Sequence, residues 1–187
     1  RLVKMHPNHI AITDLSRKSI TSLTPVVPEA MWKQFGVTGI AKSDNTGFTA
    51  PMGVTIDSLG YIYVADSKNH RLVKLNPDLT YNSQFGVTGV AKSNNTGLNS
   101  PHGVAIDKNG FVYVVEYLNH RLVKLNPDLT YNSQFGITGV AKSDNTGFKY
   151  PRTITLDSQG YIYVTDVHNH RLVKLNPDLT YNSQFGV

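Results

Sequence analysis

The sequence contains no cysteine, and this absence removes several kinds of chemistry at once. A chain without cysteine forms no disulfide, has no thiol nucleophile and offers no thiolate to zinc, although the absence does not fix a compartment. No apolar run approaches the ~20 residues that a membrane-spanning helix requires, so we expect no membrane partner. No stretch keeps the 3.6-residue apolar period of a helix either. These absences favour a globular chain of strands without disulfides.

Acidic residues are also scarce, at 13 against 18 lysines and arginines, and the formal net charge is +5. This excess favours an anionic partner modestly. Tryptophan occurs once against ten tyrosines, and valine, isoleucine and threonine are spread along the chain, a composition that is typical of strands. At 187 residues the chain is long enough to bury a core.

The dominant feature of the sequence is an internal repeat with a period of 50 residues. The string NHRLVKLNPDLTYNSQFG occurs unchanged at 69–86, 119–136 and 169–186. Its last three letters, QFG, also occur one period earlier at 34–36, which indicates a diverged fourth unit at the N-terminus. Self-similarity at a fixed period is typical of stacked supersecondary units. We expect one domain over residues 1–187, with units at approximately 1–50, 51–100, 101–150 and 151–187.

Each unit is predicted to form four antiparallel strands. In the unit 51–100, the Asp-Ser-Leu-Gly string at 57–60 and the Asn-Pro-Asp string at 76–78 are typical of turns. The strands are expected after Pro51, at 61–65, at 71–75 and at 80–85. The second of them is almost continuously apolar, which suits a strand covered on both faces. Four such strands per unit predict an all-β fold and the blades of a β-propeller, with a β-solenoid as the alternative.

The string PMGVTIDSLGYIYVADSKNHRLVKL at 51–75 resembles the NHL repeat. The resemblance is strong over 51–187 and partial over 1–50. It implies a β-propeller of NHL-type four-stranded blades, and such propellers usually close with about six blades. Four blades in this chain would leave two blade faces uncovered. Three outcomes stay open: the chain is part of a larger ring, it self-associates through its exposed blade edges, or it has an unusual four-blade geometry.

Two alignments are open for the first unit. Residues 1–4 have the same letters as 71–74, but this alignment requires a long insertion before the QFG at 34–36. The alternative aligns 10–14 with 62–66 and needs only a short insertion. We prefer the second alignment, in which residues 1–5 form the innermost strand of the first blade.

The repeats differ mainly at two places, the approach to the first strand and the end of the second strand. In a four-stranded meander both places lie on one face, around the mouth of the central channel. Scaffold folds commonly bind through such loops, although free drift of surface loops explains the same pattern. The binding residues predicted on this loop face are Met52, Lys68, His102, Tyr117, Leu118, Lys149, Tyr150, Arg152 and His168.

Some polar residues recur once per blade and are predicted to be structural. Histidines at one repeated position lie on separate blades and do not converge as zinc ligands must. Each is expected to pack at a blade corner, and each repeated acid to accept hydrogen bonds from nearby backbone, arginine or histidine. The histidines are His70, His120 and His170, and the acids are Asp66, Glu116 and Asp166.

His102 follows Pro101, and the string PHG resembles the motif with which peptidyl-amidoglycolate lyases present zinc-binding histidines. That resemblance implies three such histidines from three blades, whereas the equivalent positions here are Met52, His102 and Arg152. One ligand does not hold catalytic zinc, and Arg152 would repel the cation. We therefore predict no metal, no cofactor and no catalysis. A metal-dependent lyase or hydrolase completed by blades absent here is an alternative.

The resemblance also implies a nucleic-acid alternative, because some NHL propellers of tripartite-motif proteins bind single-stranded RNA on the loop face. The basic and aromatic residues predicted there would supply phosphate contacts and stacking platforms. Against this, much of the positive charge, at Arg71, Lys74, Lys92 and their copies, recurs in every blade and is expected to form a solvated rim. The sequence therefore favours a non-catalytic scaffold whose loop face holds a protein, peptide or glycan partner, with RNA as a weaker alternative.

Overall fold

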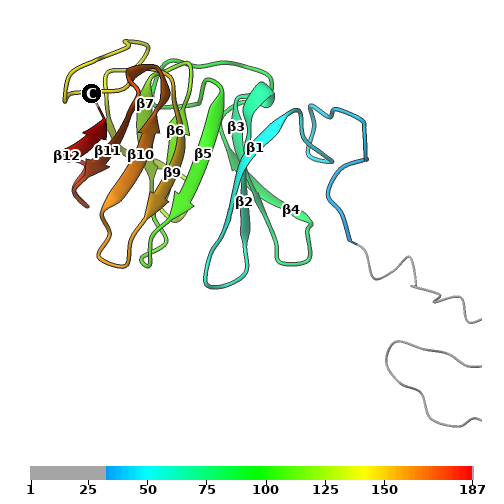
Figure 1. Ribbon diagram of the computed structural model, residues 1–187. Helices are drawn as coiled ribbons and strands as arrows, with labels where there is room; N and C mark the ends of the chain where they lie inside the picture. The colour runs from blue at the N-terminus through cyan, green and yellow to red at the C-terminus, as the bar shows by residue number, and fades with distance from the viewer. Residues whose placement is uncertain (1–32, 187) are drawn as a thin grey trace, which may run out of the picture. The chain divides into compact units, whose positions relative to one another are not determined.

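The computed structural model describes residues 33–186 (Figure 1). The chain divides into two units, Arg1–Gln34 and Phe35–Val187, and every strand described below belongs to the second. The strands predicted at 1–5 and 10–14 lie outside the described residues. Residues 33–50 carry a single isolated bridge, between Val37 and Ile40, and form the link that leads into the first described sheet. No helix in the part of the chain that the structure describes is long and apolar enough to cross a membrane.

Three four-stranded sheets follow one another, and in each the strands are antiparallel and neighbours in sequence are neighbours in space. The first comprises β1 (Pro51–Ile56), β2 (Ile62–Asp66), β3 (Arg71–Leu75) and β4 (Tyr81–Phe85). The second comprises β5 (Pro101–Ile106), β6 (Val112–Glu116), β7 (Arg121–Leu125) and β8 (Tyr131–Phe135). The third comprises β9 (Pro151–Leu156), β10 (Ile162–Asp166), β11 (Arg171–Leu175) and β12 (Tyr181–Gly186). The predicted all-β propeller blades are therefore confirmed.

The turn residues explain where the strands end. The carboxylate of Asp57 accepts hydrogen bonds from the backbone N–H groups of Leu59 and Tyr61, each at 2.9 Å, and Gly60 supplies the left-handed backbone at φ +84°. Short 3₁₀ turns at Ser67–Asn69 (η2) and Val167–Asn169 (η3) lead from second to third strand, a feature that the sequence pattern did not predict.

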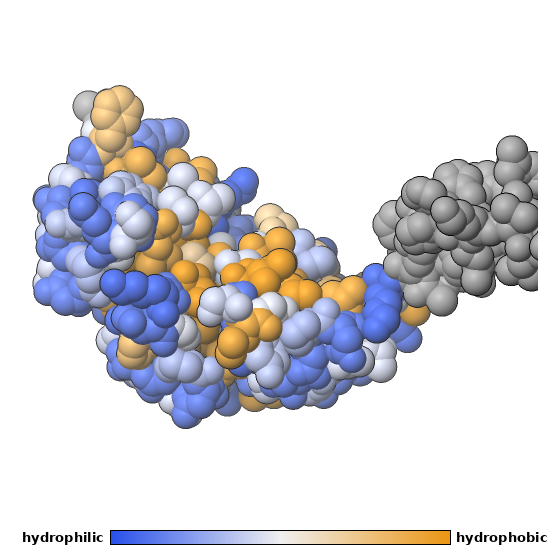
Figure 2. All heavy atoms as spheres, turned by 90° about the horizontal axis from the view of Figure 1, so that it is seen from below, coloured by the Kyte–Doolittle hydropathy of each residue, from blue (hydrophilic) through white to orange (hydrophobic). Residues whose placement is uncertain are grey.

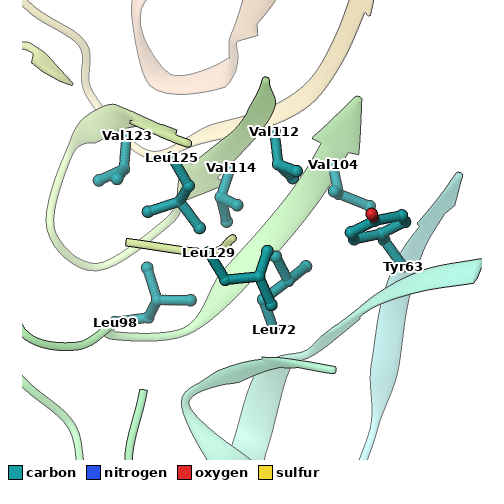
Figure 3. Packing of buried hydrophobic residues seen from close by; sticks show 9 residues of the cluster. All are labelled: Tyr63, Leu72, Leu98, Val104, Val112, Val114, Val123, Leu125 and Leu129. Atoms are coloured by element: carbon teal, nitrogen blue, oxygen red, sulfur yellow. The ribbon is translucent and has the colours of Figure 1, made fainter. Parts of the chain in front are cut away.

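The core lies between the sheets rather than within one of them. Tyr63 and Leu72 of the first sheet, together with Leu98 of the link, pack against the valines and leucines of the second sheet (Figure 3). An equivalent cluster joins the second sheet to the third. Every residue of β6 is buried, as expected for an apolar second strand covered on both faces.

The innermost strands β1, β5 and β9 approach one another closely, and two glycines permit this. A Cβ atom at Gly103 would lie 2.7 Å from the carbonyl oxygen of Arg152, and one at Gly53 would meet the carbonyl oxygen of His102. The third repeat has Thr153 at the same position. Figure 2 shows apolar surface gathered in the hollow formed by the three sheets, and Val54 and Ile56 of β1 belong to the exposed apolar residues.

Candidate functional site

Two loops of each repeat meet on one face, as the meander geometry predicts. The backbone N–H of Tyr117, at the end of β6, donates to the carbonyl oxygen of Ser100, which immediately precedes β5, at 3.0 Å. In the third sheet His168 donates to the carbonyl oxygen of Lys149 in the same way, at 3.1 Å. The link into the first strand and the loop after the second strand therefore form one continuous surface, the loop face.

A buried arginine fixes each corner of this face. Arg71 and Arg121 are fully buried and Arg171 is 8% exposed, so the prediction that these repeated arginines form a solvated rim was wrong. The reason is that the links supply acceptors for the whole guanidinium. In the second sheet, Arg121 pairs with Glu116, and its Nη2 donates to the carbonyl oxygens of Asn94 and Gly97.

The repeated acids have the structural role that the sequence predicted. Asp66 accepts from Arg71 and, at 2.7 Å, from the backbone N–H of Thr49. Burial raises the pKa of Glu116, and the guanidinium of Arg121 opposes this effect. These carboxylates are thus buried and hydrogen-bonded at the corners of the sheets.

The repeated histidines join neighbouring blades. His70 adopts a left-handed backbone at φ 53°, and its Nδ1 accepts the backbone N–H of Ser100 at 3.1 Å; His120 accepts that of Tyr150 at the same distance. Both are thus corner residues, as predicted, and burial lowers the pKa of each. His170, the third copy, is exposed.

Four rings form a continuous row on the loop face, which we call the aromatic strip: His102, Tyr117, Tyr150 and His168. His102 stacks on Tyr117 with ring centroids 4.6 Å apart and an interplanar angle of 8°. Tyr150 lies 4.9 Å from Tyr117 and 4.6 Å from His168. Arg152 places its guanidinium carbon 5.5 Å from the centroid of the Tyr117 ring. The strip crosses the junction between the second and third sheets.

The structure therefore brings together five of the nine predicted binding residues. Lys149 adjoins the strip through its backbone bond to His168. Leu118 is 44% exposed and follows Tyr117 in the chain. Met52, 57% exposed, and Lys68, also exposed, belong to the first sheet.

Ser100 is a residue of this region that sequence reasoning did not single out. Its hydroxyl lies 3.0 Å from that of Ser67 and 3.4 Å from Nε2 of His102. The signal that points to it is the difference between Ser100 and Tyr150 at equivalent positions of otherwise similar repeats.

His102 and Arg152 determine the polar character of the strip. The pKa of His102 is lowered by burial and, to a smaller degree, by the charge of Arg152. Nδ1 of His102 is buried without a hydrogen-bond partner. The strip thus combines flat rings, a guanidinium group and an imidazole whose neutral form is favoured. Such a set can stack on a flat group and bind an anionic or hydroxyl group at its edge.

Residues 33–186 also form a cleft away from the loop face. Within this range, no group of three or more His, Asp or Glu side chains lies close enough to hold a metal ion. A cleft of about 490 Å³ opens on the opposite face, between the β5–β6 and β9–β10 turns. The carboxylates in it, Asp107 and Asp157, accept hydrogen bonds from their own turns and from Tyr113 and Tyr163.

A family model for the NHL repeat matches the chain at residues 48–75, 98–125 and 148–175. The chain therefore contains three NHL repeats. Each match begins shortly before a first strand and ends with a third strand, so the NHL pattern includes the acid, histidine and arginine of every corner. No curated protein sequence matches the chain.

Solved structures resemble these NHL blades at low identity. A streptogramin B lyase structure is 18% identical with a TM-score of 0.57, and covers 73% of this chain and 40% of its own. A catalytically inactive virginiamycin B lyase from Staphylococcus aureus, solved with quinupristin, is 15% identical with a TM-score of 0.57, at 79% and 43% coverage. Hydrazine synthase of Kuenenia stuttgartiensis is 9% identical with a TM-score of 0.58, at 81% and 39% coverage.

At these identities the likeness shows the β-propeller fold alone. The chain spans about two fifths of the length of the structures that it matches.

Proposed function

We propose that this chain is a non-catalytic NHL-repeat scaffold that holds a protein, peptide or glycan partner on its loop face. The observation that carries the proposal is the aromatic strip. Its rings come from the two loops in which otherwise copied repeats differ most, and they form one surface together with Arg152.

The side-chain chemistry of the strip supports recognition of a partner. Tyrosine offers a large, stiff contact area with a polar end, and tyrosine and arginine are enriched among the residues that dominate binding energy. Tyr117 and Tyr150 are half-buried, which limits the conformational entropy that binding would cost. The loop-face carboxylates, by contrast, are held by arginine, asparagine and backbone groups, which supports a role without chemistry.

The test is a triple variant, Tyr117→Ala, Tyr150→Asn and Arg152→Ala, probed on a peptide library and a glycan array. Asparagine is chosen at 150 because the backbone there has φ 54°, which asparagine tolerates. The ligands found with the wild type should bind the triple variant about a hundredfold more weakly. Lys108→Ala, on the opposite face, is the control and should bind as the wild type does. Unchanged affinity in a triple variant with a wild-type circular dichroism spectrum would contradict the proposal.

Single-stranded RNA is the second candidate, and the guanidinium of Arg152 over the Tyr117 ring favours it. An RNA site that makes three phosphate contacts should lose roughly twentyfold in affinity between 50 and 200 mM salt. Fluorescence anisotropy with a labelled oligonucleotide measures this slope. A flat salt response, or no binding at low salt, would eliminate RNA.

A metal-dependent lyase or hydrolase completed by further blades is the third candidate. The unpartnered Nδ1 of His102 is the observation that favours it. This function requires a stoichiometric metal ion, so elemental analysis of the purified protein tests it. The assembled protein with those further blades present, if it binds no metal after equilibration with zinc, would remove this candidate.

A further inference from the structure

The third sheet exposes side chains that the first two sheets bury against a neighbour. Leu72 and Leu122 are fully buried in the clusters between sheets, whereas Leu172, at the same repeat position, is 38% exposed. Phe135 is half-buried, and its copy Phe185 is 83% exposed. These residues belong to identical strings, so their surroundings account for the difference: Phe135 packs on Phe148 of the following link at 5.1 Å between ring centroids, whereas no described residue covers Phe185 in this way. We call this surface the β12 face.

The first sheet exposes the complementary set. Val104 of β5 is 6% exposed and packs in the same cluster as Tyr63 and Leu72. Its counterpart on β1, Val54, is 65% exposed, and the neighbouring Ile56 is 62% exposed. We call this surface the β1 face.

The hydrogen bond that joins neighbouring blades also has its two halves on these two faces. At the internal junctions, the histidine of one blade accepts the backbone N–H of the residue before the next first strand. His170 is the exposed copy of that acceptor. Ala50 occupies the donor position and has the same left-handed backbone, at φ 52° against 53° for Ser100 and 54° for Tyr150.

We propose that a second copy of this chain docks head to tail, with its β1 face on the β12 face of the first copy. The occupant is a second copy because the chain already makes this contact twice, between its first and second sheets and between its second and third. Each face complements the other face rather than itself. The contact is therefore heterologous, and it can close a ring or extend a chain.

Thr153 makes this junction differ from the two internal ones. Gly53 and Gly103 let the next innermost strand approach, because a Cβ at either position would meet the carbonyl oxygen of its neighbour. Thr153 carries that Cβ, and its hydroxyl pairs with that of Thr165 at 2.9 Å. An incoming β1 strand must sit farther from β9, so this contact is weaker than the internal junctions. The variant Thr153→Gly should tighten it several-fold.

Two one-sided variants test the docking. Leu172→Lys with Phe185→Ser disables the β12 face, and Val54→Lys with Ile56→Lys disables the β1 face. By light scattering behind a sizing column, the wild type should grow in mass with concentration, and each variant alone should remain at 20.7 kDa. An equimolar mixture should form a dimer, because each variant keeps the face that the other lacks. A wild type that is monomeric at every concentration, or a variant that still pairs with itself, would overturn the proposal.

Cysteine crosslinking gives a second readout that does not depend on the lysine variants folding. The chain has no cysteine, so Ala50→Cys and His170→Cys each introduce a single thiol. The two thiols lie at the donor and acceptor positions of the hydrogen bond expected at the proposed contact. Mixed and mildly oxidised, the two variants should form a crosslinked heterodimer much faster than either forms a homodimer. Equal rates of the three products would contradict head-to-tail docking.

Discussion

Gly103 and Thr153 occupy the same position of their repeats, but a neighbouring strand approaches closely only at Gly103. The effect of this difference on stability is measurable. Adding a Cβ at Gly103 forces it within 2.7 Å of a backbone carbonyl, which has no flexible side chain to move away. Gly103→Ala should lower the free energy of unfolding by about 1–3 kcal/mol in urea titrations. Thr153→Ala keeps the Cβ at an exposed position, and should stay within about 0.5 kcal/mol of the wild type. Equal effects at both positions would contradict the close approach of the inner strands.

The histidines at the blade junctions predict a loss of stability in mild acid. Nδ1 of His70 and of His120 accepts a backbone N–H, and protonation would place a second donor there. Burial lowers the pKa of both rings; at His120 it outweighs the opposing carboxylate of Asp166. A histidine whose folded pKa is lowered contributes stability that is fully present above its unfolded pKa of about 6.5. This stability declines as the pH falls from there towards the folded pKa.

Thermal melts between pH 8 and pH 5 measure this dependence. The double variant His70→Asn and His120→Asn tolerates the left-handed backbone and keeps an acceptor, so its melting temperature should change less with pH than that of the wild type. His168 and Lys149 also lower the pKa of His120 and remain in both proteins, so the comparison isolates the two junction rings. Parallel curves for the two proteins would contradict the prediction.

At the scale of the strand and its link, the buried arginine connects segments that are distant in sequence. Arg121 lies at the start of β7, yet it binds carbonyl oxygens of residues 94 and 97 in the preceding link. Arg121→Met leaves the buried carboxyl group of Glu116 without its cationic partner, and should cost about 3–5 kcal/mol of unfolding free energy. Adding Glu116→Gln replaces that carboxyl group with a neutral amide and should restore part of the loss. A double variant less stable than Arg121→Met alone would contradict the pairing.

The elements themselves were predictable, because local signals decide them. The Asp-x-x-Gly and Asn-Pro-Asp strings place the turns, and the four predicted strands of 51–100 agree with β1–β4 to within one residue. The burial of Arg71 was not predictable from its spacing. Its backbone acceptors, the carbonyl oxygens of Asp44 and Gly47, lie 27 and 24 residues earlier in the chain. A charge that recurs in every blade looks the same in the sequence whether it is solvated or enclosed.

The loop face was predictable as a surface but not as a set of contacts. The meander rule placed both variable loops together, and internal comparison of the repeats singled out Tyr117 and Tyr150. Ring stacking across the second and third sheets depends on side-chain directions that the period does not encode. Met52 and Lys68, which the same rule selected, belong to the first repeat, whereas the rings of the strip come from the second and third.

At the scale of the three sheets together, strands of identical sequence have different surroundings. β7 and β11 share every residue, so the intrinsic exchange rates of their amides match, but Leu122 is fully buried and Leu172 is 38% exposed. In dilute monomeric protein, the amides of β7 should exchange more slowly than those of β11 by nuclear magnetic resonance. Equal protection of the two strands would show that stability is uniform along the array.

The buried arginine and its acceptors in the preceding link also have a consequence for how repeats are added to such a chain by duplication. Arg71 depends on carbonyl groups of Asp44 and Gly47, and Arg121 on those of Asn94 and Gly97, so each blade is completed by residues that precede its first strand. A gene duplication or a graft that starts at a proline such as Pro51 would copy four strands and leave their guanidinium without the carbonyl acceptors of the preceding link. One that starts at the preceding glycine, Gly36 or Gly86, copies the strands together with those acceptors. The heritable unit of this architecture is therefore the link with the blade that follows it.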